Sequence, residues 1–197
     1  MIVWSIQPRE VYNSIIETET YRCDPNQIKL PEFKPYYDWL VQQLPERIGH
    51  APDGVTYPVW AWYMWEGKRG VPEPWEDDIA DNVAIELDVP EDQVLLSDFD
   101  GWNLILNDAL ISWDQDEDRA LKELYDSLGD RDKKAMKQKN RERVFDLHPV
   151  DNGWTTNGSS IQATMWELME KYLPVTKFLL LDSCLWILNY LCYSKNL

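Results

Sequence analysis

Hydrophobic and polar residues alternate along four short segments, which is the pattern of strands with one buried face. These segments are residues 2–7, 55–65, 83–89 and 94–96. The second contains the run YPVWAWYMW and carries aromatic rings on both of its faces. We therefore expect this strand to be buried on one side and to meet a flat or apolar group on the other.

In other segments apolar residues recur every three to four positions, which predicts helices. These helices cover residues 8–18, 31–44, 99–110, 116–128 and 130–144. Ser97 and Asp98 stand where a helix cap is expected. The last two helices, divided at Gly129, are expected to form a peripheral hairpin over residues 114–146. Interleaved strands and helices predict an α+β fold, with a single domain over residues 1–178 built on a small, bent, mixed sheet flanked by helices.

Residues 160–172 fit two interpretations. Apolar residues at positions 161, 165, 168, 169 and 172 indicate a helix, and Ser159 with Gln162 resembles a capping box. The alternative is a strand over residues 161–167 that ends before a turn at Leu173 and Pro174. Periodicity alone favours the helix only slightly and leaves both open.

The acidic charge of the chain is concentrated in one segment. The chain has 19 Lys and Arg against 35 Asp and Glu, which gives a formal net charge of −16. Between Gly70 and Asp118 there are 16 acidic residues and no Lys or Arg. This balance opposes general binding to a nucleic-acid backbone and to an acidic membrane surface. It fits either solvated helix faces or a negative face that docks on a basic partner.

The charge inverts within the predicted hairpin. From Asp114 to Asp130 there are seven acidic and two basic residues, and from Arg131 to Arg143 there are seven basic and two acidic residues. Complementary charges on two successive helices are typical of a solvated helix pair.

The cysteines, the histidines and the two ends of the chain indicate a cytoplasmic protein. Three cysteines without paired spacing do not resemble a secreted disulfide framework, and two distant histidines do not predict a metal site. The first residues lack the charged and apolar regions of a signal peptide. The apolar tail, residues 179–197, is interrupted by Asp182, Ser183 and Asn189, so it is expected to dock as a helix rather than to span a membrane.

Aromatic residues are the main anomaly of the composition. The chain has 11 Trp and 10 Tyr, but none of the common phosphate-loop, dinucleotide, hydrolase or zinc-protease motifs. Large rings fill a core, and they also form stacking platforms for a planar ligand such as a nucleobase or nicotinamide. Lys68 and Arg69, just past the Trp-rich strand, are the nearest cations for a phosphate.

Five segments resemble a family of bacterial and phage proteins, the domain of unknown function 3841. They are VWSIQPREVY, YRCD, YPVWAWYMWEGKR, LDVPEDQVLLSDFDGWNLILN and IQATMWELMEKYLPVTKF. Together they cover most of the chain as far as Phe178. The resemblance implies membership of a family, and it carries no established activity to this chain.

The order of these segments also resembles, more distantly, the ADP-ribosyltransferases of the DarT-like group. In those enzymes a late strand carries Gln-Ala-Glu, whose Glu orients the nicotinamide ribose and activates the acceptor. The aligned residues here are Gln162, Ala163 and Thr164, so a hydroxyl stands where the enzymes have a carboxylate. Glu167 could replace that carboxylate if the strand bulges or ends early. The resemblance favours the strand over residues 161–167.

The resemblance implies an ADP-ribosyltransferase-like fold that binds NAD or an NAD-derived nucleotide noncovalently, with little or no turnover. The candidate catalytic residues are Gln162, Thr164 and Glu167. The residues expected to line the pocket, as rings, polar groups and cations, are Trp4, Gln7, Tyr21, Arg22, Trp60, Trp62 and Arg69. The alternative function is an acidic interaction protein, for example a phage anti-defence protein or a nucleic-acid mimic that binds a basic partner.

Overall fold

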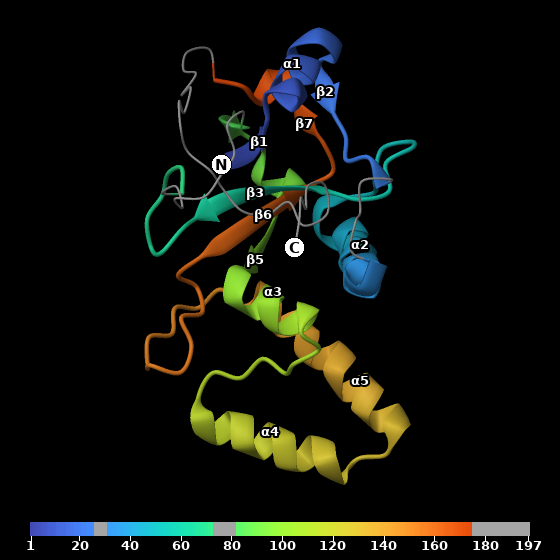
Figure 1. Cartoon of the computed structure of the whole chain (residues 1–197), viewed down its shortest axis with the longest axis vertical. Helices are drawn as coiled ribbons and strands as arrows, with labels where there is room; N and C mark the ends of the chain where they lie inside the picture. The colour runs from blue at the N-terminus through green and yellow to red at the C-terminus, as the bar shows by residue number, and fades with distance from the viewer. Residues whose placement is uncertain (26–30, 73–81, 175–197) are drawn as a thin grey trace. The chain divides into compact units, whose positions relative to one another are not determined.

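The computed structural model describes residues 1–25, 31–72 and 82–174 of an α+β chain (Figure 1). The predicted apolar tail, residues 179–197, lies outside the described residues. With η for a 3-10 helix, the elements in chain order are β1 (Ile2–Pro8), α1 (Arg9–Thr18), β2 (Thr20–Tyr21), η2 (Pro31–Phe33), α2 (Lys34–Ile48), β3 (Val59–Met64), β4 (Asn82–Asp88), η3 (Glu91–Gln93), β5 (Leu95–Asp98), α3 (Phe99–Leu106), α4 (Gln115–Ser127), α5 (Asp130–Arg141), η4 (Glu142–Phe145), β6 (Ile161–Met165), β7 (Leu168–Met169) and η5 (Glu170–Tyr172).

The chain divides into two compact units. The first unit contains Met1–Tyr63, Arg69–Leu95 and the described residues from Ala163 onward. The second unit contains Met64–Lys68 and Leu96–Gln162.

Five strands form one sheet in the order β4-β1-β3-β6-β5. β1 pairs antiparallel with both β3 and β4, and Trp4 lies opposite Trp62 on one side and Glu86 on the other. The sheet is therefore antiparallel, whereas the sequence predicts a mixed sheet. The physical reason for the difference is that alternation along a segment reports which face of a strand is buried and carries no information on the direction of its neighbours. β2 and β7 form a second, two-stranded sheet.

Two helices cover the strands of the first unit. α1 contacts β1 and β4 and buries Val11 and Ile15. α2 buries an apolar stripe, and its Tyr37 ring lies edge-on to the Trp60 ring of β3 at a centroid distance of 6.3 Å. Trp60 and Trp62 are each 5% exposed, so both tryptophans of β3 belong to the core.

The second unit is organised around α3 and its cap. As predicted, Asp98 caps α3: its Oδ1 accepts from the backbone N of Gly101 at 2.7 Å. Its Oδ2 accepts from the backbone N of Gly158 at 2.8 Å, which joins the loop before β6 to the start of the helix. One buried carboxylate therefore fixes two segments that are 60 residues apart.

α3 ends at Leu106, four residues earlier than the pattern of apolar residues predicts. Asp108 adopts the left-handed conformation with φ 54°. The backbone N of Ala109 donates to the Leu104 carbonyl, and that of Asp108 donates to the Ile105 carbonyl, which is the double closure of a Schellman motif. The Asp108 carboxylate pairs with Lys137 and Arg141 of α5, so contacts from a distant helix hold this end of α3.

Residues 161–165 form a strand, so the strand interpretation of this segment is correct and the helix suggested by periodicity is wrong. All five residues of β6 are buried. The strand ends at Met165, before Glu167, and η5 follows the short β7. The residues of β6 alternate between apolar (Ile161, Ala163, Met165) and polar (Gln162, Thr164), as in a strand, and the helical spacing arose only because apolar residues of β7 and η5 follow.

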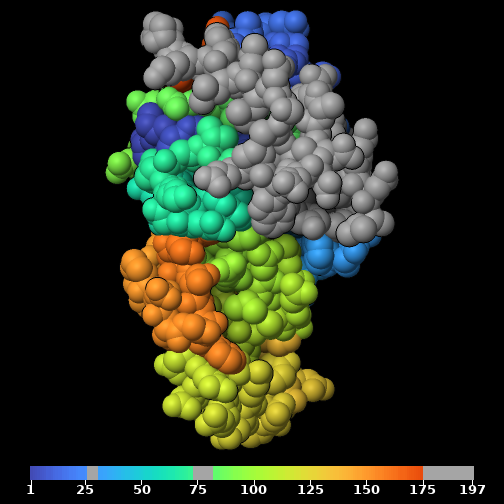
Figure 2. Space-filling view, turned by 60° about the vertical axis from the view of Figure 1, so that its left-hand side comes forward, coloured from blue at the N-terminus to red at the C-terminus, as the bar shows by residue number. Residues whose placement is uncertain are grey.

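α4 and α5 form the predicted pair of helices on either side of Gly129. Asp114 caps α4 by accepting from the backbone N of Glu117 at 2.8 Å. The loop over residues 146–160, orange in Figures 1 and 2, lies beside the light-green segment around α3. Within this unit, Thr156 donates to Asp100 at 2.5 Å and Trp154 donates to Ser112 at 3.1 Å.

The pKa of Asp98 leads to a prediction on stability. Burial raises this pKa above its ordinary value of 3.8, although two backbone amides that donate to the carboxylate act in the opposite direction. With a raised pKa in the folded state, the contribution of Asp98 to stability is fully present below its unfolded pKa. It is lost as the pH rises through the folded pKa.

We expect the free energy of unfolding of the wild type to fall relative to that of Asp98→Asn as the pH rises from the unfolded to the folded pKa of Asp98. The Asn amide does not titrate, so the variant lacks this contribution to the pH dependence. Urea unfolding of both proteins at several values from about pH 3 to about pH 7 measures it. Parallel profiles for the two proteins would contradict the raised pKa.

Candidate functional site

A cavity of about 460 Å³ lies within the first unit. Its wall comes from three parts of the chain: the C-terminal end of α2 with the turn after it, the segment around η3, and the residues that follow β6. The lining residues are Glu46, Arg47, Ile48, Gly49, His50, Pro52, Val89, Asp92, Gln93, Met165, Trp166, Glu167 and Tyr172.

Glu167 is the candidate catalytic residue that reaches this cavity. Because β6 has ended at Met165, Glu167 no longer follows the alternation of the strand. Its Oε2 accepts from Nε of Arg22 at 2.9 Å and from the Thr20 hydroxyl at 3.3 Å. Arg22 also donates to the Asp53 carbonyl at 3.3 Å. A carboxylate at the cavity wall is therefore held in place by an arginine and a hydroxyl.

The aromatic part of the wall consists of Trp166 and Tyr172. Trp166 is 7% exposed, and its Nε1 donates to the Gly49 carbonyl at 2.8 Å. The Tyr172 hydroxyl donates to Oε1 of Gln93. Both rings are thus fixed by polar contacts at their edges, which keeps them in position as apolar surfaces beside charged groups.

Charged residues of both signs line the cavity. Arg47 and His50 come from the end of α2 and the turn after it, and Asp92 comes from η3. Nη1 of Arg47 donates to the side-chain and backbone oxygens of Gln43, both at 3.3 Å, within the last turns of α2. Such a wall offers acceptors for the hydroxyl groups of a ligand and donors for an anionic group.

Gln162 and Thr164 are buried within β6, at 4% and 0% exposure. The Thr164 hydroxyl donates to the Leu95 carbonyl at 3.1 Å. Oε1 of Gln162 has no hydrogen-bond partner among the described residues. Neither side chain is part of the cavity wall.

Trp4 and Arg69 meet at another place in the first unit, and Trp62 lies opposite Trp4 in the pairing of β1 with β3. The Arg69 guanidinium lies 3.5 Å from the centre of the Tyr63 ring and 5.5 Å from that of Trp4. It donates to the Ile2 carbonyl at 2.6 Å, and Nε1 of Trp4 donates to Glu86 at 3.1 Å. Arg69 therefore stacks on the sheet and is partly occupied by contacts within the protein.

The side chain of Gln7 and the backbone of Tyr21 contribute to contacts between strands. Gln7 donates to the Ser5 hydroxyl, which donates to the Trp60 carbonyl, both at 2.9 Å. Tyr21 pairs with Leu168 in the small sheet, one residue from both Arg22 and Glu167. Of the predicted set, the structure thus brings Tyr21, Arg22 and Glu167 close to one another, and Glu167 is the one of the three that lines the cavity.

Sequence reasoning missed the residues of the cavity that come from α2 and η3. Arg47, His50 and Asp92 carry no motif, and more than 40 residues separate His50 from Asp92. No local pattern could have assigned these side chains to one wall, because the fold alone brings the segments together.

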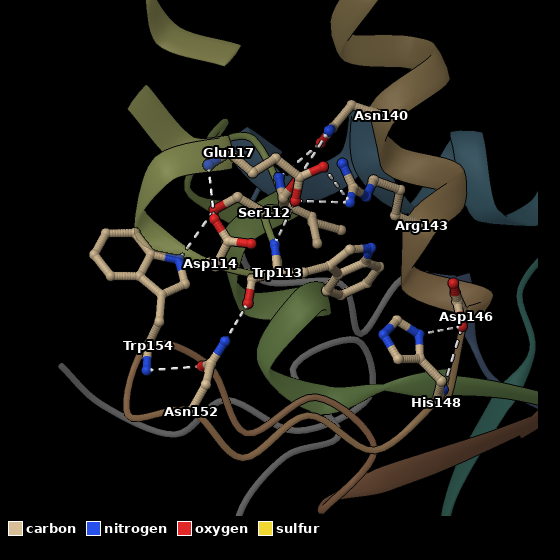
Figure 3. Close-up of polar contacts among 11 residues, drawn as sticks. Ser112, Trp113, Asp114, Glu117, Asn140, Arg143, Asp146, His148, Asn152 and Trp154 are labelled. Atoms are coloured by element: carbon tan, nitrogen blue, oxygen red, sulfur yellow. Dashed lines mark hydrogen bonds and ion pairs between the residues drawn. The ribbon is translucent and has the colours of Figure 1, made fainter. Parts of the chain in front are cut away.

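The second unit contains a network of polar and aromatic side chains (Figure 3). Nη2 of Arg143 lies 2.8 and 3.0 Å from the two carboxylate oxygens of Glu117, and its guanidinium lies 4.5 Å from the centre of the Trp113 ring. The Trp113 ring lies edge-on to His148 at 4.9 Å. Nδ1 of His148 is 2.7 Å from Oδ1 of Asp146, and this hydrogen bond lowers the pKa of the Asp146 carboxyl.

This network joins helices and loop within the unit. Asn140 of α5 holds both backbone groups of Ile111, accepting at 2.7 Å and donating at 3.0 Å. Asn152 donates to the Trp113 carbonyl at 2.7 Å and accepts from the Trp154 backbone at 3.0 Å. Because these groups satisfy one another, we interpret the network as structural support.

The described residues contain neither a cluster of metal ligands nor a helix that could span a membrane. Within residues 1–25, 31–72 and 82–174, no group of three or more His, Cys, Asp or Glu side chains could hold a metal ion. In the same part of the chain, no helix has the length and apolar character needed to cross a membrane.

Comparison with known proteins identifies one family. The model of the family DUF3841, a domain of unknown function, matches residues 2–173. No curated protein and no solved structure matches the chain. The matched range contains every residue of the cavity wall.

Proposed function

The chain belongs to the DUF3841 family, a domain of unknown function, and from the geometry of its cavity we propose that it binds a nucleotide, with NAD or an NAD-derived nucleotide as the ligand class. The observation that carries the proposal is the Glu167 carboxylate, which lines the cavity and is fixed by Arg22 at 2.9 Å. A carboxylate oxygen is an acceptor for ribose hydroxyl groups, as the acidic residue of dinucleotide-binding folds illustrates.

The remaining parts of the wall support the same ligand class. Trp166 and Tyr172 provide apolar rings beside which a base or nicotinamide fits. Arg47 and His50 provide donors for a phosphate oxygen. The volume of about 460 Å³ lies within the range of roughly 300–1,000 Å³ that is typical of small-molecule sites.

We propose binding without efficient cleavage of the nicotinamide–ribose bond. That reaction develops positive charge on the ribose, which a neighbouring carboxylate stabilises. Thr164 carries no charge, and its hydroxyl is engaged with the Leu95 carbonyl. The charge of Glu167 is balanced by the Arg22 guanidinium. The chain is therefore expected to act by holding the nucleotide, as a sequestering or sensing protein does.

The alternative, an acidic surface for a basic partner, is less favoured because acids of the segment between Gly70 and Asp118 are engaged within their own units. Glu86 accepts from Trp4, and Glu117 pairs with Arg143. Asp98 accepts from two backbone amides and Asp108 pairs with α5. Contacts of this kind reduce the charge that remains for a partner.

Glu167→Gln tests the proposal. The substitution keeps the shape of the side chain but removes the charge that binds Arg22 and the ribose hydroxyl groups. We expect NAD or ADP-ribose to bind the variant at least about tenfold more weakly than the wild type, which corresponds to about 1.4 kcal/mol. Isothermal titration calorimetry measures the affinity, and a thermal-shift screen with NAD, ADP-ribose, ATP and cyclic nucleotides first identifies the ligand.

Glu170→Gln is the matched control. Glu170 carries the same charge three residues later, is exposed and does not line the cavity. This variant should bind the nucleotide as the wild type does. With free nucleotide at 100 times the dissociation constant, the wild type should gain about 2.7 kcal/mol of stability. Equal affinities of the wild type and Glu167→Gln, or no binding by the wild type, would contradict the proposal. Rapid NAD consumption by the wild type would contradict the expected lack of turnover.

A further inference from the structure

The hairpin formed by α4 and α5 leaves most of its surface exposed. α4 buries none of its 13 residues, and Asn140 is the buried residue of α5. The hairpin, yellow in Figure 2, lies on the surface of the second unit. On its inner side Tyr125 of α4 contacts Lys133 and Lys137 of α5, at 5.0 and 5.2 Å from the centre of the ring.

The outward face of α4 combines acidic residues with small and apolar ones. Burial and helical spacing assign to it residues that are all exposed: Asp116, Ala120, Glu123, Leu124 and Ser127. Leu124 is 51% exposed, the highest value among the large hydrophobic residues that the structure describes as exposed. Asp116 pairs with Arg119 at 3.2 Å on the same helix, whereas Glu123 forms no ion pair within the described part of the chain.

The outward face of α5 has the opposite charge. By the same criteria it consists of Arg131, Lys134, Ala135, Gln138 and Lys139. Among the described residues, no ion pair engages Arg131, Lys134 or Lys139. Ala135 lies in the middle of this basic face and leaves room for a larger apolar side chain.

We propose that this hairpin is a self-association surface, where the acidic face of α4 in one copy packs against the basic face of α5 in a second copy. A two-fold axis makes the contact twice, because each copy offers one acidic and one basic face. Leu124 of each copy then lies against Ala135 of its partner. Glu123 of one copy is then paired with basic residues of the other, and Asp116 adds a second negative charge at the same contact.

The charge distribution of the whole chain favours this segment for contact between two copies. The net charge of −16 opposes self-association in general. The acidic run from Asp114 and the basic run that ends at Arg143 balance each other, so the hairpin is neutral in sum. Two copies therefore repel each other least where their hairpins meet.

A charge-exchange experiment tests the proposal with the full chain. The first variant combines Asp116→Lys with Glu123→Lys, and the second combines Arg131→Glu with Lys134→Glu. Each variant then has like charges on both faces, so neither is expected to dimerise alone. An equimolar mixture restores opposite charges at both contacts and is expected to form a heterodimer. Sedimentation velocity measures the masses, and circular dichroism verifies that both variants are helical.

Salt and one apolar substitution complete the test. The wild type is expected to dimerise at low salt, and its dissociation constant should rise at least about tenfold between about 0.05 and 0.5 M NaCl, because salt screens exposed charges. Leu124→Ser should weaken the dimer, whereas Ile16→Ser, which changes a residue 43% exposed in the first unit, should not. A monomeric wild type at low salt, or a mixture of the two variants that stays monomeric, would overturn the proposal.

Discussion

Replacing Trp102 by alanine is expected to lower the free energy of unfolding by about 3–5 kcal/mol. Trp102 is 4% exposed on α3, so the substitution removes a large buried ring. The helix is closely packed at this point: a Cβ built on Gly101 would lie 3.5 Å from both Ile111 and Val144. Since neighbours in such a site cannot collapse into the space, the variant should keep a cavity. Urea unfolding followed by circular dichroism measures the loss.

Trp154→Ala is the control for this substitution. Trp154 is 43% exposed, and its indole N–H donates to the Ser112 hydroxyl at 3.1 Å. Removing it should cost about 1 kcal/mol, the contribution of one hydrogen bond. A loss below about 1 kcal/mol for Trp102→Ala would show that its side chain does not belong to the core.

Gly158→Ala is expected to destabilise the protein by roughly 3 kcal/mol. Gly158 has φ 77°, a conformation that costs an alanine about 1–2 kcal/mol. Its Cβ would also lie 2.6 Å from the Leu147 carbonyl oxygen and 3.1 Å from Cα of Pro149. Because these are backbone atoms, the loop must move. That movement disturbs the hydrogen bond from Gly158 to Asp98, which joins the loop to the cap of α3.

Gly153→Ala separates the cost of the left-handed backbone conformation from the cost of the close contact with Leu147. Gly153 has nearly the same φ, 74°, but its Cβ would meet no atom within 4 Å. This variant should lose only the conformational part, about 1–2 kcal/mol. Equal losses for the two variants in urea unfolding would mean that the close approach of Leu147 does not contribute.

Local chemistry in the sequence accounts for much of the secondary structure. Alternation predicts the strands around residues 2–7 and 83–89, which the structure has as β1 and β4. Capping chemistry predicts the start of α3, where Asp98 accepts from the Gly101 backbone. The pair of helices divided at Gly129 follows from the same kind of signal. These features depend on residues within a few positions of one another, so a single sequence contains them.

Tertiary contacts decided the features that local patterns describe wrongly. α3 ends at Leu106 because Asp108 adopts a left-handed conformation and pairs with α5, which lies about 30 residues later. β6 is a strand, although its apolar spacing also fits a helix. Strand neighbours satisfy its backbone groups, and their identity depends on sheet order.

In the candidate site, too, some residues were predicted from the sequence and others were found only in the tertiary structure. The sequence by itself predicted Tyr21, Arg22 and Glu167 among the residues of a nucleotide site, and this assignment stays a prediction. Only the tertiary structure brought Arg22 to Glu167 across 145 positions and placed Arg47 and His50 on the same cavity wall. The physical reason is that periodicity reports which side of an element is buried, whereas the meeting of distant side chains depends on how the strands are ordered and where each one ends.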